Sequence, residues 1–82
     1  MQLEILTPEK KIFEGEVTIA TFPGVSGSFQ VMDNHAPLIS LLQPGTLEYK
    51  GKEGTNRISI LGGVVEVLKN KVIVLATGTT RA

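Results

Sequence analysis

Hydrophobic and polar positions alternate along most of this chain, as they do in strands with one buried face. The segment Gln2–Leu6 alternates until Thr7-Pro8 ends it, and Thr46–Lys50 alternates with Leu47 and Tyr49 on its inner side. The run Lys71–Ala76 is apolar at nearly every position, which is typical of a strand buried on both faces. No segment keeps a period of 3.6 residues. The pattern therefore predicts an all-β fold.

Turn residues separate these segments at intervals of about 8–10 residues, a spacing typical of sandwiches and barrels. Pro23-Gly24 has the composition of a type II turn, Gly62-Gly63 that of a hairpin turn, and Lys69-Asn70-Lys71 that of a tight turn. Thr77–Ala82 reads as a polar tail. We predict one domain over residues 1–82, a two-sheet β-sandwich or flattened barrel of about nine to ten short strands.

The stretch from Phe22 to Ile39 concentrates the unusual chemistry of the chain. It holds the only histidine, the only aspartate and two of the four prolines. Asp33–Pro37 should end the preceding strand, because Asp and Asn bond their own backbone in turns and Pro37 restricts the residue before it. We expect the imidazole of His35 to bond to a nearby backbone group at this tip. An exposed polar tip of this kind is the first place to look for a function.

Composition excludes several classes of function. Eight basic and eight acidic side chains cancel, and with only four aromatic residues this argues against a nucleic-acid-binding surface. There is no cysteine, no apolar run of about 20 residues and no signal-peptide pattern, so we expect a soluble intracellular domain. Ser28 and His35 lack the context of a nucleophile and its base, and His35 alone cannot hold a metal. We expect no catalytic residues, no cofactor and no metal.

Apolar residues exceed what a thin core requires. Leu41, Val72 and Val74 are expected inside, but adjacent pairs such as Ile12-Phe13 and Leu38-Ile39 cannot both point inward from one strand. These pairs predict apolar groups on an outer face. On a small domain, an apolar outer face usually marks a surface for a partner.

The ordered set of segments resembles the epsilon subunit of bacterial F-type ATP synthase. The resemblance covers nearly the whole chain. It is carried by the opening Leu3–Val17, by Pro23-Gly24 through Gly27, by Asn34–Leu38 and Pro44-Gly45, and by Gly62–Val67 and Val72–Ala76. In that family this region is an amino-terminal β-sandwich at the foot of the central rotor stalk, against the gamma subunit and the ring of c subunits.

The resemblance implies a non-catalytic rotor subunit that couples proton flow to ATP synthesis within an alpha, beta, gamma and epsilon assembly. Its location would be peripheral, on the cytoplasmic face of the bacterial inner membrane, with membrane contact only through the c-ring. The isolated domain would be monomeric. By position, the residues implied to face gamma are Thr7, Ile12, Phe13, Ile39, Ser40 and Pro44. Those implied to approach the c-ring are Ser28, Gln30, Asn34 and His35.

Most members of that family continue with a two-helix domain where this sequence stops. The sequence is consistent with a naturally short member or with a piece of a longer chain, and we expect the short form without the helical arm. The main alternative is a lipoyl- or biotinyl-like carrier domain, or another small β-sandwich interaction module. A carrier needs a lysine at its functional tip. Met32–His35 has none, although Lys50, Lys52, Lys69 and Lys71 flank other hairpins.

Overall fold

The computed structural model describes residues 1–80, which form ten strands joined by short turns. Their order in the sheet is β10-β7-β6-β3-β5-β8-β9-β1-β2, with β4 paired to β3. Among the strands of residues 1–80, only β1 and β9 pair in parallel. The strands are β1 (Gln2–Leu6), β2 (Lys11–Glu16), β3 (Ile19–Gly24), β4 (Gly27–Met32), β5 (Leu38–Leu42), β6 (Gly45–Gly51), β7 (Gly54–Ile60), β8 (Gly63–Leu68), β9 (Lys71–Ala76) and β10 (Thr79–Thr80).

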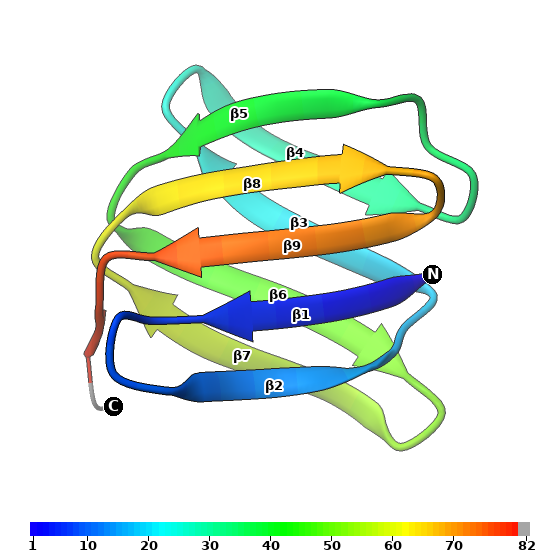
Figure 1. Ribbon diagram of the computed structural model, residues 1–82, viewed down its shortest axis with the longest axis horizontal. Coiled ribbons are helices and arrows are strands. Elements are labelled where there is room, and N and C mark those ends of the chain that lie inside the picture. Colours follow the sequence, from blue (N-terminus) through cyan, green and yellow to red (C-terminus); the bar gives the residue numbers. More distant parts are fainter. Residues whose placement is uncertain (81–82) are drawn as a thin grey trace.

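The sheet folds over into two layers (Figure 1). One layer contains β5, β8, β9, β1 and β2, and the other contains β4, β3, β6 and β7, with β10 paired to β7. The layers connect where β3 meets β5, at the pair Gly24–Leu42. The predicted all-β, two-sheet architecture is therefore confirmed.

The core lies between the layers and is made of the inward positions of both. Leu3 and Ile5 of β1, Phe22 of β3 and Leu47 of β6 are fully buried, as alternation along each strand requires. The Phe13 ring of the edge strand β2 packs on Tyr49 of β6, in the other layer, with 4.4 Å between ring centroids. The buried side chains thus form one continuous cluster across both layers.

Two of the predicted turns are wrong. Pro23-Gly24 lies inside β3, where Pro23 pairs with Ser28, and the chain reverses two residues later at Val25-Ser26. Gly62-Gly63 does not make a hairpin, because β7 pairs with β6 and β10 while β8 pairs with β5 and β9. These glycines instead carry the chain from one layer to the other, with φ values of 133° and 146° that side-chain-bearing residues rarely adopt.

The end of the chain follows the prediction more closely. Lys69 and Asn70, with φ values of 52° and 61°, make a two-residue turn between β8 and β9, as predicted. Within the predicted polar tail, Thr79-Thr80 forms the short strand β10 beside β7, and residues 81–82 lie outside the described part of the chain. The run Lys71–Ala76 is not buried on both faces, because Leu75 is half-exposed.

Candidate binding surface

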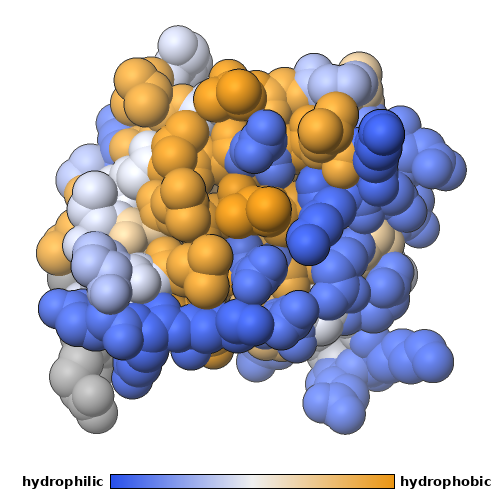
Figure 2. Space-filling model, in the orientation of Figure 1, coloured by the Kyte–Doolittle hydropathy of each residue, from blue (hydrophilic) through white to orange (hydrophobic). Residues whose placement is uncertain are grey.

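The outer side of the β5-β8-β9-β1 layer is largely apolar. Figure 2 shows a continuous hydrophobic area over β5, β8 and β9, bordered by hydrophilic residues along the edge where β2 lies. We call this surface the apolar face. It consists of the outward side chains Leu6 of β1, Ile39 and Leu41 of β5, Val64 and Leu68 of β8, and Ile73 and Leu75 of β9.

Strand register explains why these side chains gather. Leu41 lies opposite Val64, Val64 opposite Leu75, and Leu75 opposite Leu6, so one apolar row crosses four strands. Ile39 and Leu41 are 72% and 63% exposed, although neither carries a polar group. Our expectation that Leu41 belongs to the core is wrong. Leu42, its neighbour, takes the inward position, and only one of the two can.

The six positions implied to face gamma do not form one patch. Ile39 belongs to the apolar face, whereas Ser40, the next residue of β5, shares the inward side with half-buried Leu38. Thr7 and Pro44 lie in the β1–β2 and β5–β6 turns, at the same end of the sandwich (Figure 1). Residues Ile12 and Phe13 are on β2, separated from β5 by three strands.

The pair Ile12-Phe13 is accommodated by a β-bulge rather than by an exposed outer position. Phe13 lies opposite Ile5 and Lys11 opposite Leu6, which leaves Ile12 as the extra residue. Both Ile12 and Phe13 are half-buried and pack against the core. The expectation that every adjacent apolar pair places one member outside is therefore wrong for this pair and correct for Leu38-Ile39.

The four positions implied to approach the c-ring do lie together. Ser28 and Gln30 point outward from β4, which within the described part of the chain pairs only with β3, and Asn34 and His35 follow in the turn after it. These side chains run along one edge and end at a polar tip. We call this stretch the β4 edge.

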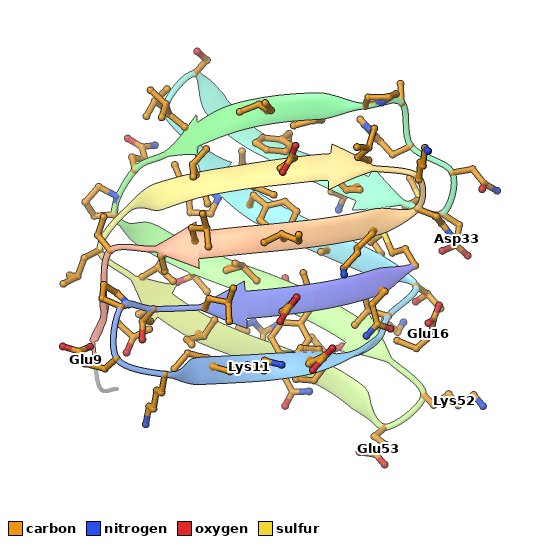
Figure 3. The ribbon with its side chains drawn as sticks, in the orientation of Figure 1. Glu9, Lys11, Glu16, Asp33, Lys52 and Glu53 are labelled. Carbon is orange, nitrogen blue, oxygen red and sulfur yellow. The ribbon has the colours of Figure 1, made fainter. Side chains whose placement is uncertain are left out.

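Hydrogen bonds hold the tip in place. The backbone N–H of Asn34, a residue with φ 64°, donates to Oδ1 of Asn70 at 2.8 Å. His35 Nδ1 donates to the backbone carbonyl of Ala36 at 2.7 Å, as expected for this imidazole. The Met1 ammonium donates to Asp33 Oδ1 at 2.6 Å and to Glu16 Oε2 at 2.7 Å. Asp33 and Glu16 lie at the same end of the sandwich (Figure 3). The tip is therefore fixed to the starts of β1 and β9.

Charged residues on β2 neutralise one another. Lys11 Nζ lies 2.6 Å from Glu14 Oε1 and 3.2 Å from Glu4 Oε2. The hydrogen bonds that Lys11 donates, first to Glu14 and then to Glu4, raise the pKa of Lys11 above its usual value, and the bond from Lys11 lowers the pKa of Glu14. This edge of the layer thus presents paired charges, unlike the apolar face beside it.

Residues 1–80 contain no cluster of three His, Cys, Asp or Glu side chains that could hold a metal ion. Within the same residues, no helix is long and apolar enough to cross a membrane. The features that remain to explain binding are the apolar face and the β4 edge. Sequence reasoning anticipated Ile39 but missed Leu41, because the inward member of Leu41-Leu42 depends on strand register.

A two-layer β-sandwich with an uncovered apolar sheet face is the architecture of a small interaction domain. The chain belongs to the family described as "ATP synthase, Delta/Epsilon chain, beta-sandwich domain", whose model matches residues 1–82. The predicted resemblance is confirmed.

Named relatives agree with this assignment. The chain is 41% identical over 81 residues to the ATP synthase epsilon chain of Pelotomaculum thermopropionicum, covering 99% of this chain and 60% of that protein. It is 42% identical over 79 residues to that of Nitratiruptor sp., covering 95% and 61%. The chain thus spans about 60% of the length of these relatives.

The same fold occurs in two solved ATP synthases. A chain of the Euglena gracilis mitochondrial enzyme, in a structure of OSCP, F1 and c-ring, matches with a TM-score of 0.88 and 23% identity, covering 95% of this chain and 51% of that one. A chain in the Tetrahymena thermophila central stalk and c-ring structure matches with a TM-score of 0.80 and 20% identity, covering 96% and 64%.

Proposed function

We propose that this chain is a non-catalytic part of the central stalk of a proton-translocating F-type ATP synthase. In this role it binds the gamma subunit through the apolar face and the c-ring through the β4 edge, and it helps to couple proton flow to ATP synthesis. Its location would be peripheral, on the cytoplasmic face of a bacterial inner membrane. Family membership and the relatives named ATP synthase epsilon chain support the assignment to this complex.

The observation that carries the gamma contact is the exposure of Ile39 and Leu41 on an otherwise well-packed domain. Side chains of this type gain free energy when a partner covers them, at about 25 cal/mol per Å² of apolar area. Thr7 and Pro44 would contact gamma beside this face, and Ser40, Ile12 and Phe13 would support it from β5 and β2.

The β4 edge suits a different, polar partner. Ser28, Gln30, Asn34 and His35 offer hydrogen-bonding groups without a carboxylate or ammonium, and the bond from the Asn34 backbone to Asn70 holds the tip in place. A ring of identical subunits presents the same loop repeatedly, and a rigid polar edge can contact several neighbouring copies of that loop. We therefore assign this edge to the c-ring.

The test of the gamma contact is the Ile39→Asp variant. A carboxylate introduced there would be desolvated without a partner in the complex, so we expect binding to purified gamma subunit to be lost, a cost of at least about 2 kcal/mol. Circular dichroism should show the variant folded, since Ile39 is 72% exposed. Binding would be followed by gel filtration of the mixed proteins.

Met32→Asp is the matched control. Met32 is also apolar and 54% exposed, but it lies at the end of β4, in the other layer. This variant should bind gamma normally. If Ile39→Asp still forms the complex, the apolar face is not the gamma surface. If the unaltered chain binds neither gamma nor membranes that contain the rest of the enzyme, the proposed function fails altogether.

A further inference from the structure

A single carboxylate stands in the middle of the apolar face. Glu66 points outward from the centre of β8, directly opposite Ile39 on one side and Ile73 on the other. Val64 and Leu68, two residues away on the same strand, share its outward direction. The outward side chains next to Glu66 on its own strand and directly opposite it on both neighbouring strands are therefore apolar.

This carboxylate makes no ion pair within residues 1–80. The other two outward carboxylates in the same row, Glu4 and Glu14, are both paired with Lys11, at 3.2 Å and 2.6 Å. Lys71 is a diagonal neighbour of Glu66 across the β8–β9 pair, but no ion pair joins them. In the isolated domain Glu66 is exposed, so water solvates its charge.

A hollow lies beside Glu66. It has a volume of about 390 Å³ and is walled by β5 and β8. Apart from Glu66 the residues that line it are apolar: Pro37, Leu38, Ile39, Val67 and Leu68. Such a hollow accommodates the aliphatic stem of a long basic side chain, whose charged end would reach the carboxylate.

Covering the apolar face changes the energetics of Glu66. A partner that buries the surrounding leucines and isoleucines also removes water from this carboxylate. An ion that loses its water without gaining a counter-ion costs several kcal/mol, which would offset much of the gain from burying the apolar groups. A partner that binds this face must therefore supply a positive charge at this point.

We propose that the partner inserts an arginine or lysine side chain into the hollow and pairs it with Glu66. This rests on the proposed function, which makes the gamma subunit the partner. Arginine suits the site better, because its guanidinium is more weakly hydrated than an ammonium and bonds a carboxylate with two parallel N–H groups. Glu66 then selects a partner with a basic residue within an apolar surface.

Binding of purified gamma subunit to the chain and its Glu66→Gln variant tests this inference. Glutamine keeps the shape but removes the charge, so the partner's cation would be buried without a counter-ion. We expect Kd to rise roughly 10- to 100-fold, and Glu66→Lys to bind more weakly still. Glu53→Gln, at the exposed β6–β7 turn in the other layer, is the matched control and should leave Kd unchanged.

Other outcomes separate the two proposals. If Glu66→Gln binds gamma as tightly as the unaltered chain or more tightly, while Ile39→Asp does not bind, the ion pair is wrong and the apolar face stands. If both variants bind normally, neither the face nor the ion pair is used. If the unaltered chain does not bind gamma at all, the ion pair falls together with the gamma contact on which it rests.

Discussion

At the scale of single residues, Gly63 shows how one backbone position limits the fold. Its φ is 146°, and a Cβ atom there would lie 2.9 Å from the Cα of Ala76 and closer still to the carbonyl oxygen of Leu75. Those atoms belong to the neighbouring strand β9, which cannot retreat without losing its pairing with β8. The crossing between the layers therefore requires a residue without a side chain.

Gly63→Ala should lower the free energy of unfolding by at least about 3 kcal/mol, because strain in φ and overlap with β9 act together. Gly54→Ala is the control. Gly54 also has a positive φ, of 113°, but its Cβ position is open, so we expect a cost of only about 1–2 kcal/mol. Urea unfolding of both variants measures the difference. Equal costs would mean that β9 shifts to make room.

Tyr49 links a single residue to the pH dependence of stability. Burial raises the pKa of its hydroxyl above the ordinary value of 10.0. In the unfolded chain the hydroxyl deprotonates at its ordinary pKa, whereas in the folded domain it does so only at higher pH. The stabilisation is therefore present below about pH 10 and is lost as pH rises through the folded pKa.

Tyr49→Phe should lose less stability than the unaltered chain between pH 9 and 11. Lys11, whose pKa is also raised, titrates in a similar range and contributes equally to both proteins. The difference between their unfolding free energies across this range therefore isolates Tyr49. If the free energies of unfolding of the two proteins ran parallel as pH rises, the Tyr49 hydroxyl would be accessible to water in the folded domain.

At the scale of elements, the β8–β9 turn serves two purposes. Lys69 and Asn70 both adopt a positive φ, which lysine tolerates poorly. The side-chain oxygen of Asn70 also accepts a hydrogen bond of 2.8 Å from the backbone amide of Asn34. Lys69 thus adds only backbone strain, whereas Asn70 also supports the tip of the β4 edge.

Lys69→Gly should therefore stabilise the domain by about 0.5–1 kcal/mol, since glycine adopts the required φ without strain. Asn70→Gly should not, because it removes a hydrogen bond worth about 1 kcal/mol while relieving a similar strain. Thermal unfolding of the two variants decides between these effects. Equal stabilisation by both would mean that the bond to Asn34 contributes nothing.

At the scale of the whole molecule, burial rather than hydrophobicity decides what a side chain contributes. Phe22 and Ile39 are both large and apolar, yet Phe22 is fully buried between the layers and Ile39 is 72% exposed. A domain of 82 residues has a total stability of about 4–12 kcal/mol. A single core residue can thus account for a large share of it.

Phe22→Ala should cost about 3–5 kcal/mol and bring the domain close to unfolding at physiological temperature. Ile39→Ala should change stability by no more than about 0.5 kcal/mol, while it weakens binding to gamma. Chemical unfolding and gamma binding, measured on the same two proteins, separate the two roles. A large loss of stability in Ile39→Ala would instead place this residue in the core of the domain.

Local chemistry in the sequence was sufficient for the fold class and for most strands. Alternation at Gln2–Leu6 and Thr46–Lys50 reflects the geometry of a strand, and Lys69-Asn70 makes the turn that its composition predicts. Residues close together in the sequence determine these strands and this turn, so both can be predicted from the sequence. The residues of the β4 edge also follow one another closely in sequence, which explains why they lie together.

Only the tertiary structure decided which strands pair and which apolar side chains face outward. Gly62-Gly63 permits a hairpin or a crossing between layers, and the pairing of β8 with β5 and β9 selects the crossing. Ile12-Phe13 and Leu38-Ile39 look alike in sequence, but a bulge absorbs the first pair and leaves the second with one exposed member. Register between distant strands has no local signal, because shifting a strand by one residue exchanges its two faces. For the same reason, the position of Glu66 between Ile39 and Ile73 emerges only when three strands are in place.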